Sequence, residues 1–298
     1  MIRQKDIWIG MAAAALLMMG CGDDDVSFQG STSGSGGDAS GGGGTGGTSQ
    51  GSGGNGAGGG MGGAGGMEPV SDWSCLGTLP APGFMAGNQT ATFQVTSLNG
   101  TSPVIGATVN ICGLMDFLCD NPLGSAITDN DGEVTLPVTT AQPIFVETTS
   151  SITQASLRFV NGAVQDGEPY GITPITPAEL TTFATTLGGN VTPGAGHVAA
   201  IAVDCEGNPA AGVEFTLDNA TPDTLTGYIA PDGSVDPNQT VSTSNGGVIF
   251  INVPAGFATV NATLQDGDLH ISNRVVFARG DWVSDAAPNS PTPAAMTP

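Results

Sequence analysis

Short runs in which apolar and polar residues alternate begin at Met67 and are separated by Gly, Pro, Asn and Asp. In Glu133–Val138, for example, Val134, Leu136 and Val138 fall on one face of an extended chain. Alternation with a period of two is typical of half-buried strands, and many short strands between turn residues favour an all-β sandwich. The expected strands of a first set are Ala91–Leu98, Ile105–Cys112, Glu133–Val138, Ile144–Thr148 and Ser156–Val160. Those of a second set are His197–Asp204, Val213–Leu217, Gly247–Val253, Ala258–Leu264 and His270–Ala278.

One short helix is expected between the two sets. Thr176 is a suitable N-cap, Pro177 suits the first helical position, and Glu179 completes a capping box. Gly188 and the glycine after it end the pattern. The apolar residues of one helical face are Leu180, Phe183, Ala184 and Leu187. The helix is therefore predicted to be amphipathic and to pack on the edge of a β-domain.

The two strand sets repeat one another. Pro103–Gly106 aligns with Pro209–Gly212, and Thr128–Val134 aligns with Thr243–Ile249. Each set thus has a Pro-x-x-Gly segment before one strand and a Thr-x-x-x-Gly turn before a later one. A repeat of about 110 residues is the length of one domain, so the pattern indicates a tandem duplication.

The N-terminus has the regions of an export signal. A short positive segment is followed by the apolar stretch Ile7–Met19, and Gly20 precedes Cys21. This stretch is shorter than the roughly 20 residues that a membrane-spanning helix needs. A Cys after a small residue resembles the lipobox of bacterial lipoproteins, in which the sulfur is acylated and the Cys becomes the new N-terminus. We expect lipidation of Cys21; the alternative is a secretory signal with an incidental Cys.

Composition divides the rest of the chain. Residues 22–68 are acidic and then dominated by Gly and Ser, and such a segment buries too little apolar surface to offset its conformational entropy. The expected organisation is a signal peptide and lipobox at 1–21, a disordered linker at 22–68, a first β-sandwich at 72–170, a connector with the helix at 171–192, a second β-sandwich at 193–285 and a disordered tail at 286–298.

The chain is strongly acidic. It holds 27 Asp and Glu against 5 Lys and Arg, a formal charge of −22. Such a protein repels phosphate backbones, so nucleic acid is not an expected partner. It also repels anionic lipid headgroups, which leaves a lipid on Cys21 to hold it at a membrane. After removal of the signal the strong cations are Arg158, Arg274 and Arg279.

The second repeat carries a family resemblance. Its segment NPAAGVEFTLD, followed by STSNGGVIFINVPAGFATVNATL, resembles the carboxypeptidase-regulatory-like, or transthyretin-like, β-sandwich. The first repeat matches it in IGATV and TDNDGEVTLPV but lacks the Pro-x-Gly ending. Over residues 72–285 the chain resembles secreted lipoproteins of environmental Gram-negative bacteria. The resemblance implies two tandem Ig- or transthyretin-like sandwiches. It implies no chemistry, because this module is an accessory of the carboxypeptidases.

Four cysteines follow Cys21, and an even number in an exported chain suggests two disulfides. Cys112 and Cys119 flank a short loop, so one arrangement pairs them and joins Cys75 to Cys205. Alternatively, Cys75 pairs with Cys112 or with Cys119. Metal binding by these cysteines is not expected, because their spacing is not C-x-x-C and the chain has 2 His.

Other residues give weak signals for chemistry. No Ser, Cys or Asp has a recognisable nucleophile context, so no catalytic residue and no cofactor is assigned. His197 and His270 lie in strand patterns, where a structural role is the simpler interpretation than a base or ligand. Asp129 and Asp131 place oxygens at alternate positions, as in half of a calcium loop, but the rest of that loop is missing. The second repeat keeps only the turn glycine there.

These observations favour a non-enzymatic, lipid-anchored protein of the cell envelope, at the outer membrane or cell surface, that presents structural or adhesive β-sandwich modules. The alternative is a module that binds a carbohydrate or another extracellular ligand, such as a protein, through loops at one end of a sandwich. The long segment Asp218–Gln239 is the candidate for such a loop. Trp73, Trp282 and Tyr228 could stack on a sugar, although core packing is the simpler interpretation.

Overall fold

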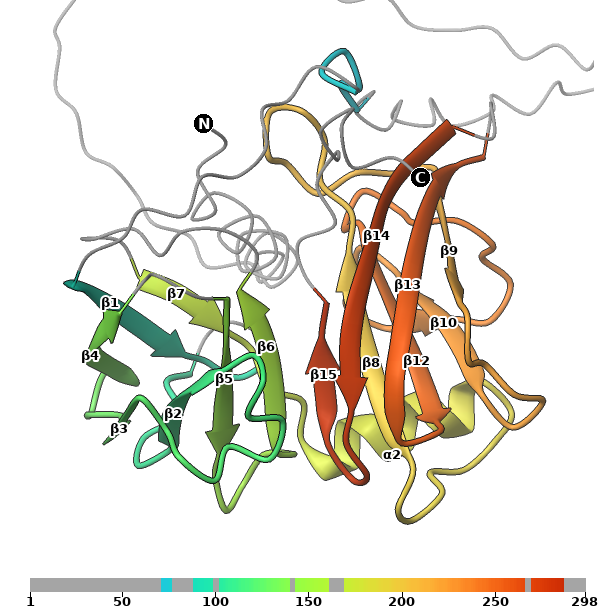
Figure 1. The fold of residues 1–298 in the computed structure, drawn as a ribbon. Helices are drawn as coiled ribbons and strands as arrows, with labels where there is room; N and C mark the ends of the chain where they lie inside the picture. The colour runs from blue at the N-terminus through green and yellow to red at the C-terminus, as the bar shows by residue number, and fades with distance from the viewer. Residues whose placement is uncertain are drawn as a thin grey trace, which may run out of the picture. The chain divides into compact units, whose positions relative to one another are not determined.

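In the computed structural model the described residues are 71–76, 88–98, 102–139, 143–160, 169–265 and 269–286. The predictions for Cys21, the linker and the tail beyond residue 286 lie outside them. Within these ranges the chain forms fifteen strands and the helix α2 (Figure 1). The first set is β1 (Asn88–Val95), β2 (Thr108–Gly113), β3 (Gly124–Ile127), β4 (Glu133–Thr139), β5 (Ile144–Thr149), β6 (Ser156–Val160) and β7 (Pro169–Ile172). Then come α2 (Pro177–Thr186), β8 (Gly196–Ile201), β9 (Val213–Leu217), β10 (Leu225–Ile229), β11 (Val235–Asp236), β12 (Gly247–Val253), β13 (Gly256–Leu264), β14 (Leu269–Ala278) and β15 (Val283–Asp285).

The predicted all-β class with one helix between two strand sets is confirmed. All ten expected strands are present, within a few residues at their ends. The helix begins after the N-cap Thr176, and the capping box forms in both directions between Thr176 and Glu179. Five further strands, β3, β7, β10, β11 and β15, were not predicted. Among the described residues, no helix is long and apolar enough to cross a membrane.

The strands form three sheets. A nine-stranded sheet has the order β11-β10-β12-β8-β15-β6-β5-β2-β3, and two three-stranded sheets have the orders β4-β1-β7 and β14-β13-β9. The nine-stranded sheet therefore takes strands from both sets. The link is β15, near the C-terminus, which pairs in parallel with β6 on one side and with β8 on the other. The domain boundary predicted within 171–192 stays a prediction.

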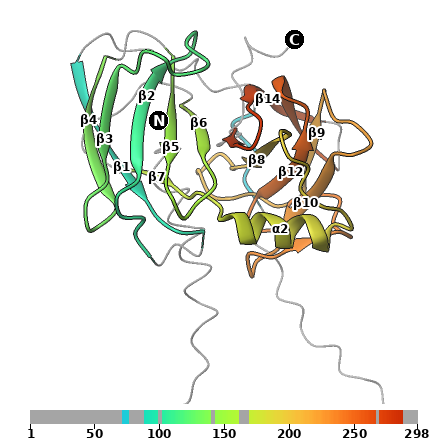
Figure 2. The same ribbon diagram turned by 90° about the horizontal axis from the view of Figure 1, so that it is seen from below.

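The pairing register shows which side chains share a face of the large sheet. One continuous row of paired residues crosses five strands, from β5 to β12: Val146, Arg158, Asp285, Ala199 and Ile249. The sheet β4-β1-β7 and Val146 belong to one apolar core. Helix α2 and Ile249 belong to another core on this same face. The core with Phe145, Phe159 and Phe250 includes residues of β9, β13 and β14, so it lies on the other face. Figure 2 shows β14 and α2 on either side of β8 and β12.

A shared set of hydrogen bonds confirms the repeat. The Thr128 hydroxyl donates to Val104 O at 2.6 Å and accepts the Ala107 N–H at 2.9 Å. In the second set the Ser242 hydroxyl donates to Ala210 O at 2.6 Å and accepts the Val213 N–H at 3.0 Å. The pairing of Pro103–Gly106 with Pro209–Gly212 is therefore right.

The alignment of Thr128 with Thr243 is wrong by one residue. The hydroxyl that occupies the position of Thr128 belongs to Ser242, because it makes the same two hydrogen bonds. Gly132 then corresponds to Gly246, and both have positive φ, at +74° and +67°. The sequence alignment paired Thr128 with Thr243 because both are threonine, whereas the equivalent hydroxyl in the structure belongs to Ser242.

Candidate functional site

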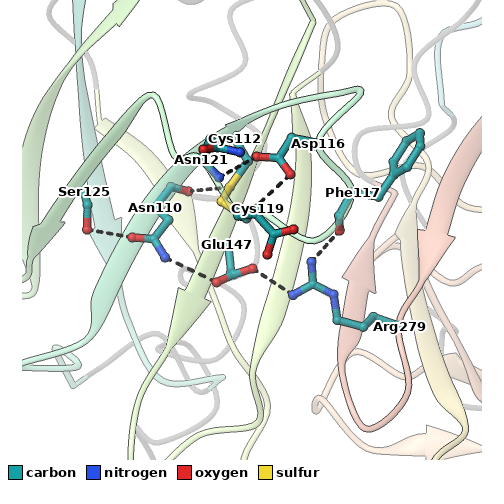
Figure 3. Close-up of a disulfide and its surroundings, with 10 residues drawn as sticks. Asn110, Cys112, Asp116, Phe117, Cys119, Asn121, Ser125, Glu147 and Arg279 are labelled. Atoms are coloured by element: carbon teal, nitrogen blue, oxygen red, sulfur yellow. Dashed lines mark hydrogen bonds and ion pairs between the residues drawn. A yellow bond between two sulfur atoms is a disulfide. The ribbon is translucent and has the colours of Figure 1, made fainter.

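A disulfide closes the loop that follows β2. Cys112 ends the buried part of this strand, and Cys119 pairs with it at a Cα–Cα distance of 5.4 Å (Figure 3). Cys119 adopts a φ of 56°, which turns the chain back toward the strand. Cys75 and Cys205 form the second disulfide, at a Cα–Cα distance of 5.6 Å. Of the three connectivities left open by the sequence, the observed one pairs Cys112 with Cys119 and Cys75 with Cys205.

Asp116 organises the disulfide loop from inside. Its carboxylate accepts the backbone N–H groups of Asp120, at 3.1 Å, and Asn121, at 2.8 Å. The backbone of Asp116 also receives the Cys119 N–H, and Leu114 N–H donates to Pro143 O. A loop with this many local bonds loses little further freedom when it contacts a partner.

Arg279 attaches the loop to the second strand set. Its Nη1 donates to a Glu147 carboxylate oxygen at 2.8 Å, and its Nη2 donates to Phe117 O at 2.5 Å (Figure 3). Glu147 also accepts from the Asn110 amide at 3.3 Å. The side chains of Arg279 and Glu147 are only 15% and 12% exposed, so their charges are screened weakly by solvent. The guanidinium lies 4.3 Å from the ring centroid of Trp282.

Aromatic rings extend this contact. The Phe117 ring lies 4.9 Å from that of Phe257 and 5.6 Å from that of Phe277, centroid to centroid. Phe257 and Phe277 are cross-strand partners in β13 and β14. The disulfide loop of the first set thus packs on the three-stranded sheet of the second.

The outer side of the loop is apolar and exposed. Met115 is 85% exposed, Leu118 is 62% exposed and Leu123 is 44% exposed. Met115, Asp116 and Leu123 also line an open hollow of about 480 Å³ that continues to Pro143. Exposed large apolar side chains on a rigid loop are a feature of interaction surfaces, since their desolvation favours binding.

The same site offers a superficial metal constellation. Ligand atoms of Cys112, Cys119 and Glu147 lie within 4.8 Å of one another. Both sulfurs are bonded to each other, however, and the Glu147 oxygens receive Arg279 and Asn110. A disulfide supplies no thiolate ligand, so this cluster does not fit a metal ion.

The second disulfide fixes the chain that leads out of the linker. Cys205 N–H donates to Asp72 O, the Asp72 N–H lies 3.4 Å from an Asp204 carboxylate oxygen, and the Ser71 hydroxyl accepts from Ala211. Residues 71–76 are therefore attached to the turn between β8 and β9, although β1 is the next strand in sequence.

The two histidines lie apart from the disulfide loop. His197 is 1% exposed on β8, and its Nδ1 accepts the Asn252 N–H at 3.4 Å. Burial lowers the pKa of the His197 imidazole to about 4, and the charge of Asp281 offsets part of this effect. His270 is half-buried on β14. For His197 the structure favours a packing role.

Asp129 serves the turn before β4. Its carboxylate accepts the backbone N–H groups of Asp131 and Glu133, each at 2.9 Å. Asp204 makes the same two bonds to the N–H groups of Glu206 and Asn208. Both carboxylates thus cap a turn that ends in a positive-φ glycine. Weak calcium binding at Asp129 and Asp131 stays a prediction.

The remaining candidates are mostly structural. Tyr228 is 4% exposed and its hydroxyl accepts the Phe215 N–H, while Trp73 and Trp282 pack against the same core. This agrees with core packing rather than a sugar platform. The segment Asp218–Gln239 is not a plain loop, because it contains β10 and β11.

Comparison with known proteins gives matches among solved structures but none among family models or curated proteins. No protein-family model matches the chain, and no curated protein matches it. Among solved structures it is similar to the shaft pilin SpaA from Lactobacillus rhamnosus GG, at 13% identity over 71% of this chain and 100% of that one, with a TM-score of 0.23. It is similar to GBS52, the minor pilin of Streptococcus agalactiae, at 14% identity over 70% and 99% of the chains, with a TM-score of 0.23. The D0–D1 domain of intimin gives 14% identity over 70% and 96%, with a TM-score of 0.19. Similarity this low establishes neither a common fold nor a common function.

Proposed function

We propose that this chain is a non-enzymatic, lipid-anchored protein of the cell envelope that presents structural or adhesive β-sandwich modules. The observation that carries this proposal is the disulfide-closed loop with exposed Met115 and Leu118. Asp116 and Arg279 hold it rigid, and its apolar side chains face outward. Such a loop suits contact with another surface better than it suits catalysis.

The location is supported by the sequence and by the cysteines. The lipobox-like Cys21 and the Gly-rich sequence that follows it suit display of the later residues at a membrane. Two disulfides are typical of an oxidising compartment outside the cytosol. The partner class that fits this role is an extracellular protein or glycan.

Localisation tests the anchor. The full chain and a Cys21→Ala variant would be expressed, the cells fractionated, and intact cells treated with external protease. We expect the unmodified chain in the membrane fraction and cleaved from outside, and the variant released. If both are released, the lipid anchor is wrong.

Adhesion tests the loop. Cells displaying a Met115→Ser/Leu118→Ser variant should adhere less to one another and to hydrophobic surfaces than cells displaying the unmodified chain. The matched control is Ile127→Ser/Ile152→Ser, since these side chains are 65% and 62% exposed but lie outside the loop. Equal loss in both variants, at equal display levels, would mean that the loop has no special role.

A further inference from the structure

A second site lies on the other face of the large sheet, in a gap between the two parts of the fold that cover this face. This face is covered over β2 and β5 by the sheet β4-β1-β7, and over β8 and β12 by α2. Between the covers is a cavity of about 520 Å³. Pockets that bind small molecules have volumes of about 300–1,000 Å³, so the size fits one small ligand.

The floor of the cavity follows from the pairing register. Arg158, Asp285 and Ala199 are neighbours in one row across β6, β15 and β8. They face the same side as Val283 and Ile249, which also line the cavity. The central strand of the floor, β15, is three residues long, and its Val283 belongs to the same apolar core as α2.

The walls are mainly apolar. They are contributed by the end of β7 and the segment after it, by α2, and by the end of β10 and the turn after it. The apolar wall residues include Ile172, Ile175, Phe183, Ile229 and Pro231. The last two belong to Asp218–Gln239, the segment that the sequence marked for ligand binding. An apolar wall of this kind favours an apolar ligand body, because binding removes apolar surface from water.

The charges around the cavity select the ligand's polar group. Arg158 is 2% exposed and is already engaged by Gly171 O, at 2.6 Å, and by Asp285, at 3.3 Å. Two further carboxylates, those of Glu179 and Asp232, also line the cavity, whereas Arg158 is the one cation among its lining residues. Asp232 is exposed, so it marks the opening to solvent. The net charge of the side chains around the cavity is therefore negative, which attracts a cation and repels an anion.

We propose that this cavity binds a small, largely apolar amine, with its apolar body against Ile175, Phe183 and Val283 and its ammonium group toward Glu179 and Asp232. This binding activity goes beyond the proposed structural role. It does not depend on the anchor at Cys21 or on the disulfide loop, so either proposal can fail without the other.

The test is a displacement titration on the full chain in the absence of detergent. N-phenyl-1-naphthylamine, a neutral apolar dye, serves as the reporter, and decylamine, decanol and decanoate compete with it. We expect the dye to bind, decylamine to displace it at the lowest concentration and decanoate at the highest. If the dye and all three competitors fail to bind, the site is refuted. Equal or better displacement by decanoate would refute the assignment of charge.

Substitutions locate the binding. Ala199→Leu adds volume in the floor and should lower dye affinity by at least about tenfold. Ala178→Leu is the matched control, because Ala178 is exposed on α2 and does not line the cavity. Thermal melting shows whether each variant folds. Dye binding that survives in a folded Ala199→Leu variant would place the ligand elsewhere.

A charge variant tests the amine separately. Glu179→Gln/Asp232→Asn keeps the capping box and the turn, since Gln and Asn retain an acceptor oxygen. Decylamine affinity should fall about five- to tenfold while decanol affinity is unchanged. Glu214→Gln/Asp236→Asn makes the same change in net charge outside the cavity and should leave both affinities unchanged. If the two double variants behave alike, the carboxylates at the cavity do not recognise the ligand.

Discussion

A β-carbon on Gly132 would lie 2.5 Å from the carbonyl oxygen of Val95. The equivalent relationship in the second set joins Gly246 to Ala202, where the distance would be 2.4 Å. In each set the glycine carbonyl also accepts an N–H from that same partner residue. The turn glycine is therefore required twice over, by its positive φ and by the close approach of a backbone oxygen.

Gly132→Ala should accordingly lower the free energy of unfolding by about 2–5 kcal/mol, since it adds a backbone clash to the strain of positive φ. Gly106→Ala is the control, because Gly106 has the same φ of +74° but open space around its Cβ position. We expect a loss of about 1–2 kcal/mol there. Urea unfolding of both variants measures the difference, and equal losses would show that the approach to Val95 O has no effect.

The hydroxyl of Thr128 gives a second prediction. Thr128→Val keeps the shape but leaves the buried Ala107 N–H and Val104 O without this partner, so we expect a loss of about 1–3 kcal/mol. Thr128→Ser should cost less, because Ser242 performs the same task in the second set. Denaturant unfolding distinguishes the two variants. A Ser variant as unstable as the Val variant would assign the effect to packing of the methyl group.

The local sequence pattern predicted the structural features that depend on residues close together in the chain. The strand Ser156–Val160, the helix that starts at Pro177 and the turn glycines all follow from short-range rules of alternation, capping and backbone conformation. The missed strands are short or carry little alternation: β15 has three residues, and β11 has two. β15 forms between two strands distant from it in sequence, β6 and β8, whereas β11 pairs with the neighbouring strand β10.

The sites were harder to predict for the same reason. Arg279 and Glu147 lie in different strand sets, and nothing close to either residue in sequence points to the other. The only feature of the sequence that pointed to Arg279 was the small number of strong cations, since Arg279 is one of three expected in the mature chain. The cavity beside Arg158 likewise depends on β15 lying between β6 and β8. Short cysteine spacing did identify the disulfide loop, since spacing is a local property.

The two disulfides should differ in their contribution to stability. In the chain-entropy treatment a cross-link stabilises by restricting the unfolded state, and more so for a longer loop. Cys75 and Cys205 are 130 residues apart, whereas Cys112 and Cys119 are 7 apart. Cys75→Ser/Cys205→Ser should therefore lower the free energy of unfolding by about 5 kcal/mol, and Cys112→Ser/Cys119→Ser by about 2 kcal/mol. Guanidinium unfolding gives both values, and a reversed order would mean that native contacts of the short loop dominate.

His197 predicts a dependence of stability on pH. The unfolded chain binds a proton near the ordinary pKa of 6.5, while burial holds the pKa of folded His197 at about 4. The stability that neutral His197 contributes is present above pH 6.5 and is lost as the pH falls to about 4, by about 3 kcal/mol. Urea unfolding at several pH values should show this slope, and His197→Asn should abolish it. His270→Asn is the control and should keep the slope. A slope that persists in His197→Asn would assign it to other groups.

The ion pair of Arg279 and Glu147 provides a final prediction. Arg279→Gln leaves the carboxylate of Glu147, 12% exposed, without its cation, and the loss of one partner of a buried pair costs about 3–5 kcal/mol. It also removes a donor to Phe117 O, so the amides of residues 113–119 should exchange with solvent faster. In Arg279→Gln/Glu147→Gln no unpaired charge remains, so stability should recover in part while the fast exchange persists. If the double variant is as unstable as the single one, the cost comes from lost contacts of the guanidinium with Trp282 and Phe117 rather than from the buried charge.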